Sequence, residues 1–394
     1  MTQRFLQYGS QQIDEADFAA VREVLEGDFL TQGPAVERFE ATLTERTGAR
    51  FAVAVSSGTA GLHIACLAAG LKPGDKGLTS ALTFVASANG IRYTGADAAL
   101  VDIDPKTLGF SGTGLTSALA THSDASVIMP VHFGGLAGDV ALIRKAAGER
   151  CIIEDACHAL GGTYEDGSPV GCGKFADMSV FSFHPVKPIT TAEGGAVVTN
   201  DPELADRLRR LRSHGIERDR SRFVAAPTGD DADAPWWYEQ HELGFNYRLS
   251  DLHAALGASQ MKRLDAFIAR RREIASYYDQ AFANLNAIIP AQADPAQRCR
   301  SAHHIYVIQA DWRAIGHTRK SFMAALAERS IGSQVHYIPV YEQPVHHDLR
   351  GRGEQDFPET AQYYKSCLTL PFHQGLTDEE VERVVVAVKE CAGQ

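Results

Sequence analysis

The segment SVFSFHPVKPITTAEGGAVVTN, residues 179–200, decides how this chain is expected to fold and what it is expected to do. Apolar residues at its start predict a buried strand that ends at the prolines on either side of Lys187, because proline cannot donate to a sheet ladder. A second short strand is predicted over Gly195–Thr199, after a glycine pair that permits a tight backbone. Lys187 is therefore expected at the end of a strand.

Lys187 is a candidate for chemistry because a lysine amine in a partly desolvated pocket loses proton affinity and becomes a nucleophile that forms an imine with an aldehyde. A surface lysine whose alkyl stem covers apolar residues is the ordinary alternative. The hydroxyls of Ser182, Thr190 and Thr191 are the groups that a phosphate needs, and together with the prolines and glycines they favour a chemical role.

Composition excludes several classes of partner. The net charge of -11 and the lack of a basic run argue against a nucleic-acid partner, which needs a basic face. The seven cysteines are scattered and show no C-x-x-C spacing, as expected for free thiols in a reducing cytoplasm. No apolar stretch reaches membrane-spanning length and the amino terminus has no apolar signal core, so we expect a cytoplasmic protein with no membrane partner.

From residue 51 onward, predicted strands alternate with helices in the pattern of a parallel sheet wrapped by helices. Seven strands are predicted to begin near residues 51, 77, 98, 126, 151, 178 and 195. The first is followed by SSGTAGLHIACLAAG, residues 56–70, whose apolar spacing predicts a helix. The backbone N–H groups of Gly58, Thr59 and Ala60 would then form a phosphate seat, with a plain strand-to-helix turn as the alternative.

The segment FSFHPVKPITTAEGG, residues 181–195, resembles the catalytic motif of the DegT/StrS sugar aminotransferases, F-S-F-H-x-x-K-x-x-T-x-G-E-G-G, with Ala192 where many members have glycine. Within it, the sequence HPVKPITTAEGG is similar to that of the UDP-sugar aminotransferases of the pseudaminic acid pathway. The resemblance extends over nearly the whole chain. It implies an α/β, aspartate aminotransferase-like fold of the fold-type I pyridoxal-phosphate (PLP) enzymes, with a seven-stranded, mostly parallel sheet. Residues 1–260 would form the large PLP-binding domain and residues 261–394 a smaller α+β domain.

The resemblance also implies roles for individual residues. Lys187 would hold PLP, and Asp155 would lie against the ring nitrogen, whose protonated form is the electron sink of PLP chemistry. An aspartate after a strand is otherwise often only a helix cap, and Glu154 should point to the opposite face of the sheet. Phe84 would stack on the pyridine ring and His158 would contact the phenolic oxygen. The implied cofactor contacts are Ser57, Gly58, Thr59, Ala60, Phe84, Asp155, His158, Ser182, Lys187 and Asn246.

The segment GFNYRLSD, residues 244–251, resembles the family's G-x-N-x-R-x-[ST]-D, in which Asn246 reaches the cofactor phosphate of the neighbouring subunit. This implies a homodimer with a shared active site. Turn chemistry and a helix cap from Ser250 or Asp251 are the alternative reading. The implied substrate contacts are Tyr8, Leu30, Thr31, Gln32, Gly33, His184, Asn246, His336, Tyr337, Ile338 and Pro339. The doublets His303-His304 and His346-His347 have no further ligand residues at helical or C-x-x-C spacing, so no metal is predicted.

Other elements follow from apolar spacing and caps. The pattern predicts helices over Asp14–Glu26, over Leu252–Phe282, over Thr318–Arg329 and from the capping box at Thr377 onward. Strands are predicted from residue 303 and over Gln334–Ile338. Residues 214–241 are predicted to form a surface loop with an aromatic anchor at residues 236–238. The G-x-G-x-x-A letters of residues 171–176 follow turn sequence and are no dinucleotide site.

The resemblance implies a PLP-dependent aminotransferase that moves an amino group from glutamate to C4 of a UDP-4-keto-6-deoxy-N-acetyl-hexose. This reaction would lie on the way to pseudaminic acid, which is used in flagellin glycosylation. The alternatives are an aminotransferase for another UDP- or dTDP-linked keto sugar, at C3 or C4, a PLP-dependent sugar dehydratase, and a non-catalytic regulatory relative. The relatives that dehydrate carry histidine at the lysine position, so Lys187 favours amino transfer.

Overall fold

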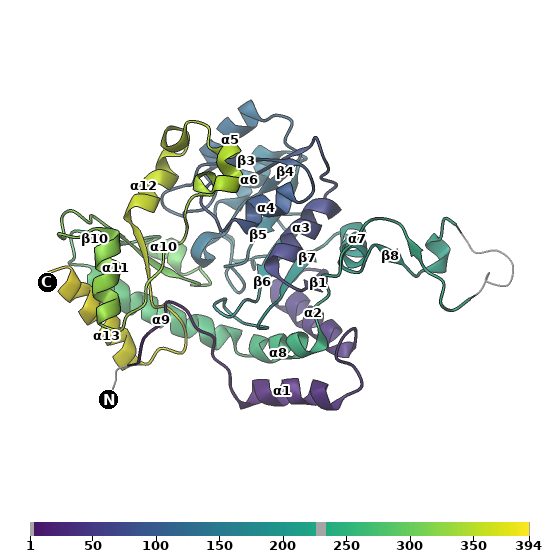
Figure 1. Cartoon of the computed structure of the whole chain (residues 1–394), viewed down its shortest axis with the longest axis horizontal. Helices are drawn as coiled ribbons and strands as arrows, with labels where there is room; N and C mark the ends of the chain where they lie inside the picture. Colours follow the sequence, from purple (N-terminus) through teal and green to yellow (C-terminus); the bar gives the residue numbers. More distant parts are fainter. Residues whose placement is uncertain (1–3, 226–233, 394) are drawn as a thin grey trace.

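The computed structural model describes residues 4–225 and 234–393. A seven-stranded sheet in the order β1-β7-β6-β5-β4-β2-β3 forms its centre (Figure 1). Within this sheet β7 runs antiparallel to β1 and β6, and the other neighbours are parallel. All seven predicted strands are confirmed: β1 (Phe51–Val55), β2 (Lys76–Ser80), β3 (Asp97–Val101), β4 (Val127–Met129), β5 (Cys151–Asp155), β6 (Met178–Ser182) and β7 (Gly195–Thr199).

The strands are apolar throughout because helices cover both faces of the sheet. Alternate residues of a strand enter different cores: Val53 and Val55 pack on one face of β1, and Ala52 and Ala54 on the other. The first face is covered by α3 (Gly58–Ala68), α4 (Ala86–Arg92) and α7 (Pro202–Arg212). The second face is covered by α2 (Pro34–Thr47), α5 (Gly112–Thr121), α6 (Val140–Ala147) and α8 (Asp251–Met261).

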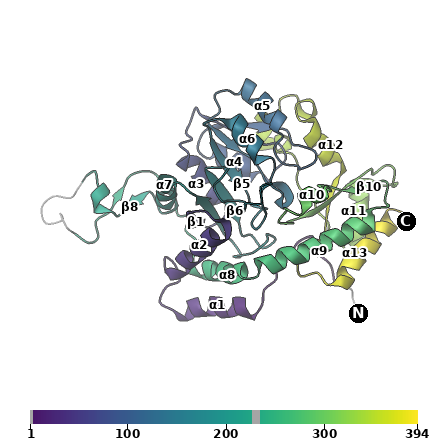
Figure 2. The ribbon, with the colours of Figure 1, turned by 180° about the vertical axis from the view of Figure 1, so that it is seen from behind.

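A second core lies in the carboxyl-terminal third of the chain. It is built on a three-stranded antiparallel sheet of β10 (Ile288–Pro290), β11 (Tyr306–Ala310) and β12 (Cys367–Leu370). The helices of this part are α9 (Leu264–Phe282), α10 (Pro295–Arg298), α11 (Arg319–Glu328), α12 (Pro358–Ser366) and α13 (Asp378–Cys391). Figure 2 shows α9 running from the large sheet toward the carboxyl terminus. Since α9 contributes to both cores, the domain boundary at residue 260 stays a prediction.

Two predicted elements are wrong. The apolar spacing predicted one helix over Leu252–Phe282, but α8 and α9 are separate helices. Between them Arg263 leaves helical geometry at φ -108° and ψ 0°, and its guanidinium pairs with Asp14 and Asp17. The strand predicted over Gln334–Ile338 is absent from the described residues, where only Gln334 makes a bridge, to Thr369. The spacing of apolar residues depends only on neighbours in the sequence, so it could not predict the effect of these long-range contacts.

Helix α1 (Glu15–Glu26) confirms the amphipathic helix predicted near the amino terminus, with Asp14 as its cap. Its apolar stripe does not face the core: Phe18 is 56% exposed, and it lines an open groove with Val21, Leu25 and Leu256. An apolar helix face in solvent is typical of a contact surface.

Residues 214–225 and 234–241 project from the body of the molecule as an arm (Figure 1). Within it β8 (Ile216–Glu217) pairs with β9 (Glu239–Gln240), and residues 226–233, including the acidic loop, lie outside the described residues. The predicted surface location is confirmed. Trp236 is 67% exposed, and Tyr238 is exposed as well, so both aromatic rings are presented to solvent. The guanidinium of Arg218 lies over the Tyr238 ring, 5.6 Å from its centroid. No helix in the described ranges has the length and apolar character needed to cross a membrane.

Glu154 of β5 is the centre of a buried cluster of polar side chains. Glu154 is 1% exposed and accepts hydrogen bonds from Tyr164, at 2.7 and 2.8 Å, and from Ser179, at 2.6 Å. Nε2 of His132 lies 3.2 Å from the same carboxylate. Burial disfavours the charge, but His132 and the hydrogen bonds outweigh it, so the pKa of Glu154 lies below its usual value of 4.5.

Glu154→Gln is expected to lower the free energy of unfolding by about 1–3 kcal/mol near pH 7, because the hydroxyl donors lose an ionised acceptor. The lowered pKa makes this contribution complete above about pH 4.5, and it is lost as the pH falls through the folded-state pKa. Urea unfolding at pH 7 and at pH 4 checks both points, with the exposed Glu165→Gln as the control. Equal stability of Glu154→Gln and the unaltered protein at pH 7 would contradict the prediction.

Candidate active site

A cavity of about 270 Å³ opens where β5, β6 and the start of α3 meet the carboxyl-terminal part of the chain. Most of the residues that the sequence predicted for the site line it together: Tyr8, Ser57, Gly58, Thr59, Phe84, Asp155, His158, Ser182, His184, Lys187, His336 and Tyr337. Segments more than 300 positions apart in the sequence therefore form one site. The individual roles of these residues remain predictions.

Lys187 lies in the loop between β6 and β7. Its backbone N–H donates to the carbonyl of His184 at 2.9 Å, and the loop closes where the Thr191 N–H donates to the carbonyl of Phe183. Burial in the cavity lowers the pKa of Lys187, although nearby Cys157 and Asp155 act in the opposite direction. The amine is therefore more easily neutral, and hence nucleophilic, than that of an exposed lysine.

Asp155 ends β5 at the cavity and is almost completely buried. The hydroxyl of Ser87 donates to Oδ2 at 2.6 Å, and the backbone N–H of Cys157 donates to Oδ1 at 3.2 Å. A second hydroxyl, that of Thr83, lies 2.7 Å from the Ser87 oxygen. The carboxylate is thus fixed in orientation, and each of its oxygens can still accept another hydrogen bond from a ligand.

Ser87→Ala removes one donor to the carboxylate of Asp155 and is expected to lower kcat about tenfold, the usual worth of a hydrogen bond to a charged group. Ser87→Thr, which keeps the hydroxyl, should retain most of the activity. The measurements are kcat and the pH dependence of the absorbance of the bound cofactor. An alanine variant with unaltered kcat and unaltered absorbance at every pH would show that Ser87 does not position Asp155.

The amino end of α3 offers hydrogen-bond donors to an anion. Ser57 caps the helix, and its hydroxyl oxygen accepts from the N–H of Ala60 at 3.0 Å, so that N–H is already used. The N–H groups of Gly58 and Thr59 have no partner within the described residues. A Cβ at Gly58 would come 2.9 Å from that of Ser182, so glycine is required for this approach. The free N–H groups and the helix dipole suit a phosphate.

Two hydroxyls expected near a phosphate lie elsewhere. Thr190 and Thr191 are buried, donate to the carbonyls of Phe183 and Glu193, and do not line the cavity. They stabilise the loop that carries Lys187. Of the three hydroxyl residues singled out in this segment, Ser182 faces the cavity.

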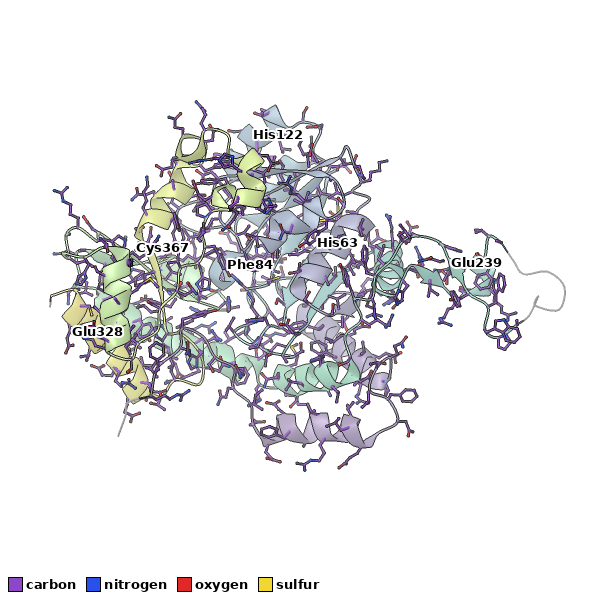
Figure 3. The ribbon with its side chains drawn as sticks, viewed as in Figure 1. His63, Phe84, His122, Glu239, Glu328 and Cys367 are labelled. Carbon is purple, nitrogen blue, oxygen red and sulfur yellow. The ribbon has the colours of Figure 1, made fainter. Side chains whose placement is uncertain are left out.

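Phe84 and His158 lie on other walls of the cavity. Figure 3 places Phe84 near the middle of the molecule, and its ring centroid lies 5.8 Å from that of Tyr337. Nδ1 of His158 accepts the N–H of Gly134 at 3.2 Å, which assigns the ring proton to Nε2, 3.1 Å from the Tyr337 hydroxyl. Burial, Lys187 and His336 hold the pKa of His158 well below its usual value, so the ring is neutral.

The remaining predicted residues do not line the cavity in one chain. Thr31 pairs with Ser250 and the N–H of Gly33 donates to Asp251 at 2.8 Å, so the loop of residues 28–34 lies against the start of α8. Asn246 pairs through its backbone with Ser213. Ser250 caps α8, as one alternative reading proposed. The predicted site residues outside the lining are Leu30, Thr31, Gln32, Gly33, Ala60, Asn246, Ile338 and Pro339.

The cavity is also lined by residues for which no role in the site was predicted: Leu62, Thr83, Ala86, Val131, Cys157, Val186, Glu193 and His304. Ser87 reaches the site indirectly, through Asp155. The spacing of Thr83 and Ser87, four positions apart beside Phe84, was the one feature of the sequence that could have indicated that these two hydroxyls lie together. The described residues contain no group of three or more His, Cys, Asp or Glu side chains arranged to hold a metal ion.

The chain is similar to known aminotransferases over nearly its whole length. Residues 11–389 match the DegT/DnrJ/EryC1/StrS aminotransferase family. The spore coat polysaccharide biosynthesis protein SpsC of Bacillus subtilis is 38% identical over 390 residues, which cover 98% of this chain and 97% of that protein. The structure of Helicobacter pylori PseC, an aminotransferase involved in the biosynthesis of pseudoaminic acid, has a TM-score of 0.86 and 29% identity, covering 99% of this chain and 100% of that one.

The sugar aminotransferase Spr1654 of Streptococcus pneumoniae has been solved in a PLP-form, with a TM-score of 0.86 and 26% identity over 99% of both chains, and in a PMP-form. The buried amine of Lys187, the fixed carboxylate of Asp155 and the donors of α3 fit the aldehyde, the ring nitrogen and the phosphate of this cofactor. When bound, PLP supplies an electron sink that stabilises negative charge at the carbon of the transferred amine. The chain therefore belongs to the DegT/DnrJ/EryC1/StrS family and is a PLP-dependent sugar aminotransferase.

Proposed function

We propose that this enzyme transfers the amino group of glutamate to C4 of UDP-4-keto-6-deoxy-N-acetyl-L-altrosamine, a step toward pseudaminic acid for glycans such as those of flagellins. The observation that carries this choice of sugar is the full-length likeness to PseC, an aminotransferase involved in the biosynthesis of that acid. The wording of residues 184–195, HPVKPITTAEGG, supports the same choice.

In the proposed reaction the side chains of the cavity hold and move protons. The Lys187 amine, made less basic by burial, is the group suited to take a proton from the α-carbon of glutamate and to deliver one to C4 of the sugar. Asp155, oriented by Ser87, would hold the cofactor ring nitrogen, while Ser57, Gly58, Thr59 and Ser182 would hold its phosphate. His184, His336 and Tyr337 are left to contact the sugar.

The proposal includes a homodimer whose active sites are shared. A UDP-sugar carries a diphosphate and glutamate carries two carboxylates, yet no arginine and only one lysine, Lys187, line the cavity of the described chain. Asn246 lies outside this lining, as expected if it serves the other subunit. The exposed aromatic residues of the arm and the apolar stripe of α1 supply candidate contact surfaces.

Mixing two inactive variants tests the shared site. Lys187→Ala and Asn246→Ala subunits, unfolded and refolded together, would form mixed dimers that contain one intact site. About a quarter of the unaltered activity should return if the subunits pair at random, since half of the dimers are mixed. No recovery, with mixed dimers confirmed by native mass spectrometry, would place Asn246 in the site of its own chain and contradict the shared arrangement.

A cytoplasmic location is part of the proposal. All seven cysteines are free, as expected in a reducing compartment. The nucleotide-linked sugar and glutamate are metabolites of that compartment as well.

The choice of sugar is tested by incubating the protein with 15N-labelled glutamate and a panel of UDP- and dTDP-linked 3-keto and 4-keto sugars. Mass spectrometry should show 15N in the product of UDP-4-keto-6-deoxy-N-acetyl-L-altrosamine, and NMR should place the new amine at C4. Amination of a different sugar in the panel, without the UDP-altrosamine product, would replace the proposed substrate while leaving the reaction class intact.

A second candidate is amino transfer to another nucleotide-linked keto sugar. It is favoured by SpsC, a spore coat polysaccharide biosynthesis protein whose 38% identity exceeds the 29% of PseC. The same panel separates the two candidates, because a pocket that accepts the N-acetyl group of the UDP-altrosamine differs from one that accepts a hydroxyl at that position.

A further inference from the structure

His304 is a buried imidazole in the cavity whose ring has no assigned partner. It is 3% exposed and lines the cavity. Hydrogen bonds reach its backbone N–H and carbonyl, but within the described residues its Nδ1 has none. A buried polar group without a partner is destabilising, so native proteins usually provide one, either in the protein or in a ligand.

The backbone of His304 is held from two sides. Its N–H donates to the carbonyl of Gly134 at 2.9 Å, and its carbonyl accepts from the guanidinium of Arg271 at 2.8 Å. The next glycine, Gly135, has φ +101°, and a Cβ there would lie 3.1 Å from the His304 nitrogen. These contacts fix the backbone of His304 at the edge of the cavity.

Arg271 is a positioning residue for this segment. It is completely buried, and within the described residues it forms no ion pair with a carboxylate. Its guanidinium instead donates to the carbonyls of His303, His304 and Phe372, and burial lowers its pKa to about 10. A buried cation whose hydrogen bonds go to carbonyl and amide oxygens, with no carboxylate among the described partners, indicates that the segment is held at a considerable desolvation cost.

The ring of His304 lies among charged and titratable groups. Its ring lies 4.3 Å from that of His158, and the charged and titratable groups that act on it are His158, Lys187, Arg271 and His336. Burial and these groups hold the pKa of His304 well below its usual value, so the ring is neutral. A neutral imidazole offers one donor and one acceptor, which matches a hydroxyl group of a sugar.

The cofactor has its own partners on other walls of the site. The donors at the start of α3 suit its phosphate, and Asp155 suits its ring nitrogen. His304 belongs instead to the wall formed by the carboxyl-terminal part of the chain, with His336 and Tyr337. This wall is free of the groups that suit the cofactor and can contact the second substrate.

We infer that His304 is a further substrate-binding residue, which hydrogen-bonds a hydroxyl of the sugar ring of the amino acceptor. The inference rests on the sugar aminotransferase activity, and on the proposed function only for the choice of probe.

Three variants test this assignment. His304→Phe keeps the ring volume and removes both nitrogens, and His304→Gln restores a donor and an acceptor. His303→Asn is the matched control: His303 is the buried neighbour, lines a separate small hollow, and has φ +51°, which asparagine tolerates. For each variant the two half-reactions are followed separately by cofactor absorbance, first with glutamate and then with UDP-4-keto-6-deoxy-N-acetyl-L-altrosamine. Binding of the aminated UDP-sugar is measured by calorimetry.

We expect His304→Phe to bind PLP and react with glutamate as the unaltered protein does. Its kcat/KM for the keto sugar should fall about ten- to a hundredfold, and its affinity for the aminated sugar should fall by a similar factor. His304→Gln should recover part of both losses, and His303→Asn should show neither. If His304→Phe does not fold, the half-reactions of His304→Gln decide, with a smaller loss confined to the sugar step expected.

Other outcomes overturn the inference. An equal loss in the glutamate step, an unaltered sugar step, or the same loss in His303→Asn would each show that the His304 ring does not bind the sugar. If the unaltered enzyme rejects the UDP-altrosamine substrate and aminates dTDP-4-keto-6-deoxyglucose, the proposed function fails. The same variants compared on that dTDP-sugar still decide the role of His304.

Discussion

Lys187→Ala is expected to abolish turnover, lowering kcat by about 10⁴-fold or more, and to remove the visible absorbance of the bound cofactor. The side chain is at once the amine that can join the aldehyde and the group suited to move the proton, so both functions are lost in one substitution. Its low proton affinity in the cavity is what equips it for the first role. Purification with added PLP, an absorbance spectrum and a steady-state assay with glutamate and keto sugar check the prediction.

Two further variants isolate the cause. Lys187→Arg keeps a cation in the cavity but cannot join an aldehyde, so it should lose the absorbance as well. Lys174→Ala removes an exposed lysine that pairs with Asp166 on the surface and should retain absorbance and turnover. A Lys187→Ala protein that is active and colourless would end the assignment of this lysine to the chemistry.

The large sheet could be predicted from the sequence because its signals are local. Each strand is a short apolar run bounded by turn residues. Because helices cover both faces of the sheet, apolar and polar residues need not alternate along a strand. The aspartate at the end of β5 also follows from local reasoning, since ligands of open α/β folds collect at that edge. Lys187 was expected at the end of a strand, but β6 ends at Ser182 and the lysine lies in the loop that follows. Their meeting in one cavity was implied by the family resemblance, and the structure brings them together.

The parts that could not be predicted depend on long-range contacts. Ser87 and Asp155 are 68 positions apart, and only the fold reveals their hydrogen bond. In the sequence His304 is only one half of a histidine doublet. The contacts of its backbone with Arg271 and Gly134, beside the cavity, have no local sign in the sequence. The break at Arg263 has the same origin: its ion pairs with the cap of α1 interrupt a helical period that continues on both sides.

Asp155→Asn is expected to lower kcat by about 10³-fold while leaving the cofactor joined to Lys187. The amide keeps the shape of the side chain and can still meet the Ser87 hydroxyl, but it carries no charge to hold the ring nitrogen in its protonated form. Because the lysine and the phosphate donors at α3 are untouched, the visible absorbance should persist with a shifted maximum. A spectrum and single-turnover rates with glutamate measure the two effects on one sample.

The neighbouring acid provides a matched control for this substitution. Glu154 precedes Asp155 on the same strand, but its carboxylate is bound behind the sheet by Tyr164 and Ser179. Glu154→Gln should therefore lose stability and keep the cofactor absorbance, whereas Asp155→Asn should lose activity and keep stability. If instead Asp155→Asn turned over near the unaltered rate, the ring nitrogen would need another acid, and the fixed carboxylate at the end of β5 would have only a structural role. The opposite consequences of two adjacent carboxylates follow from the alternation of side chains along a strand.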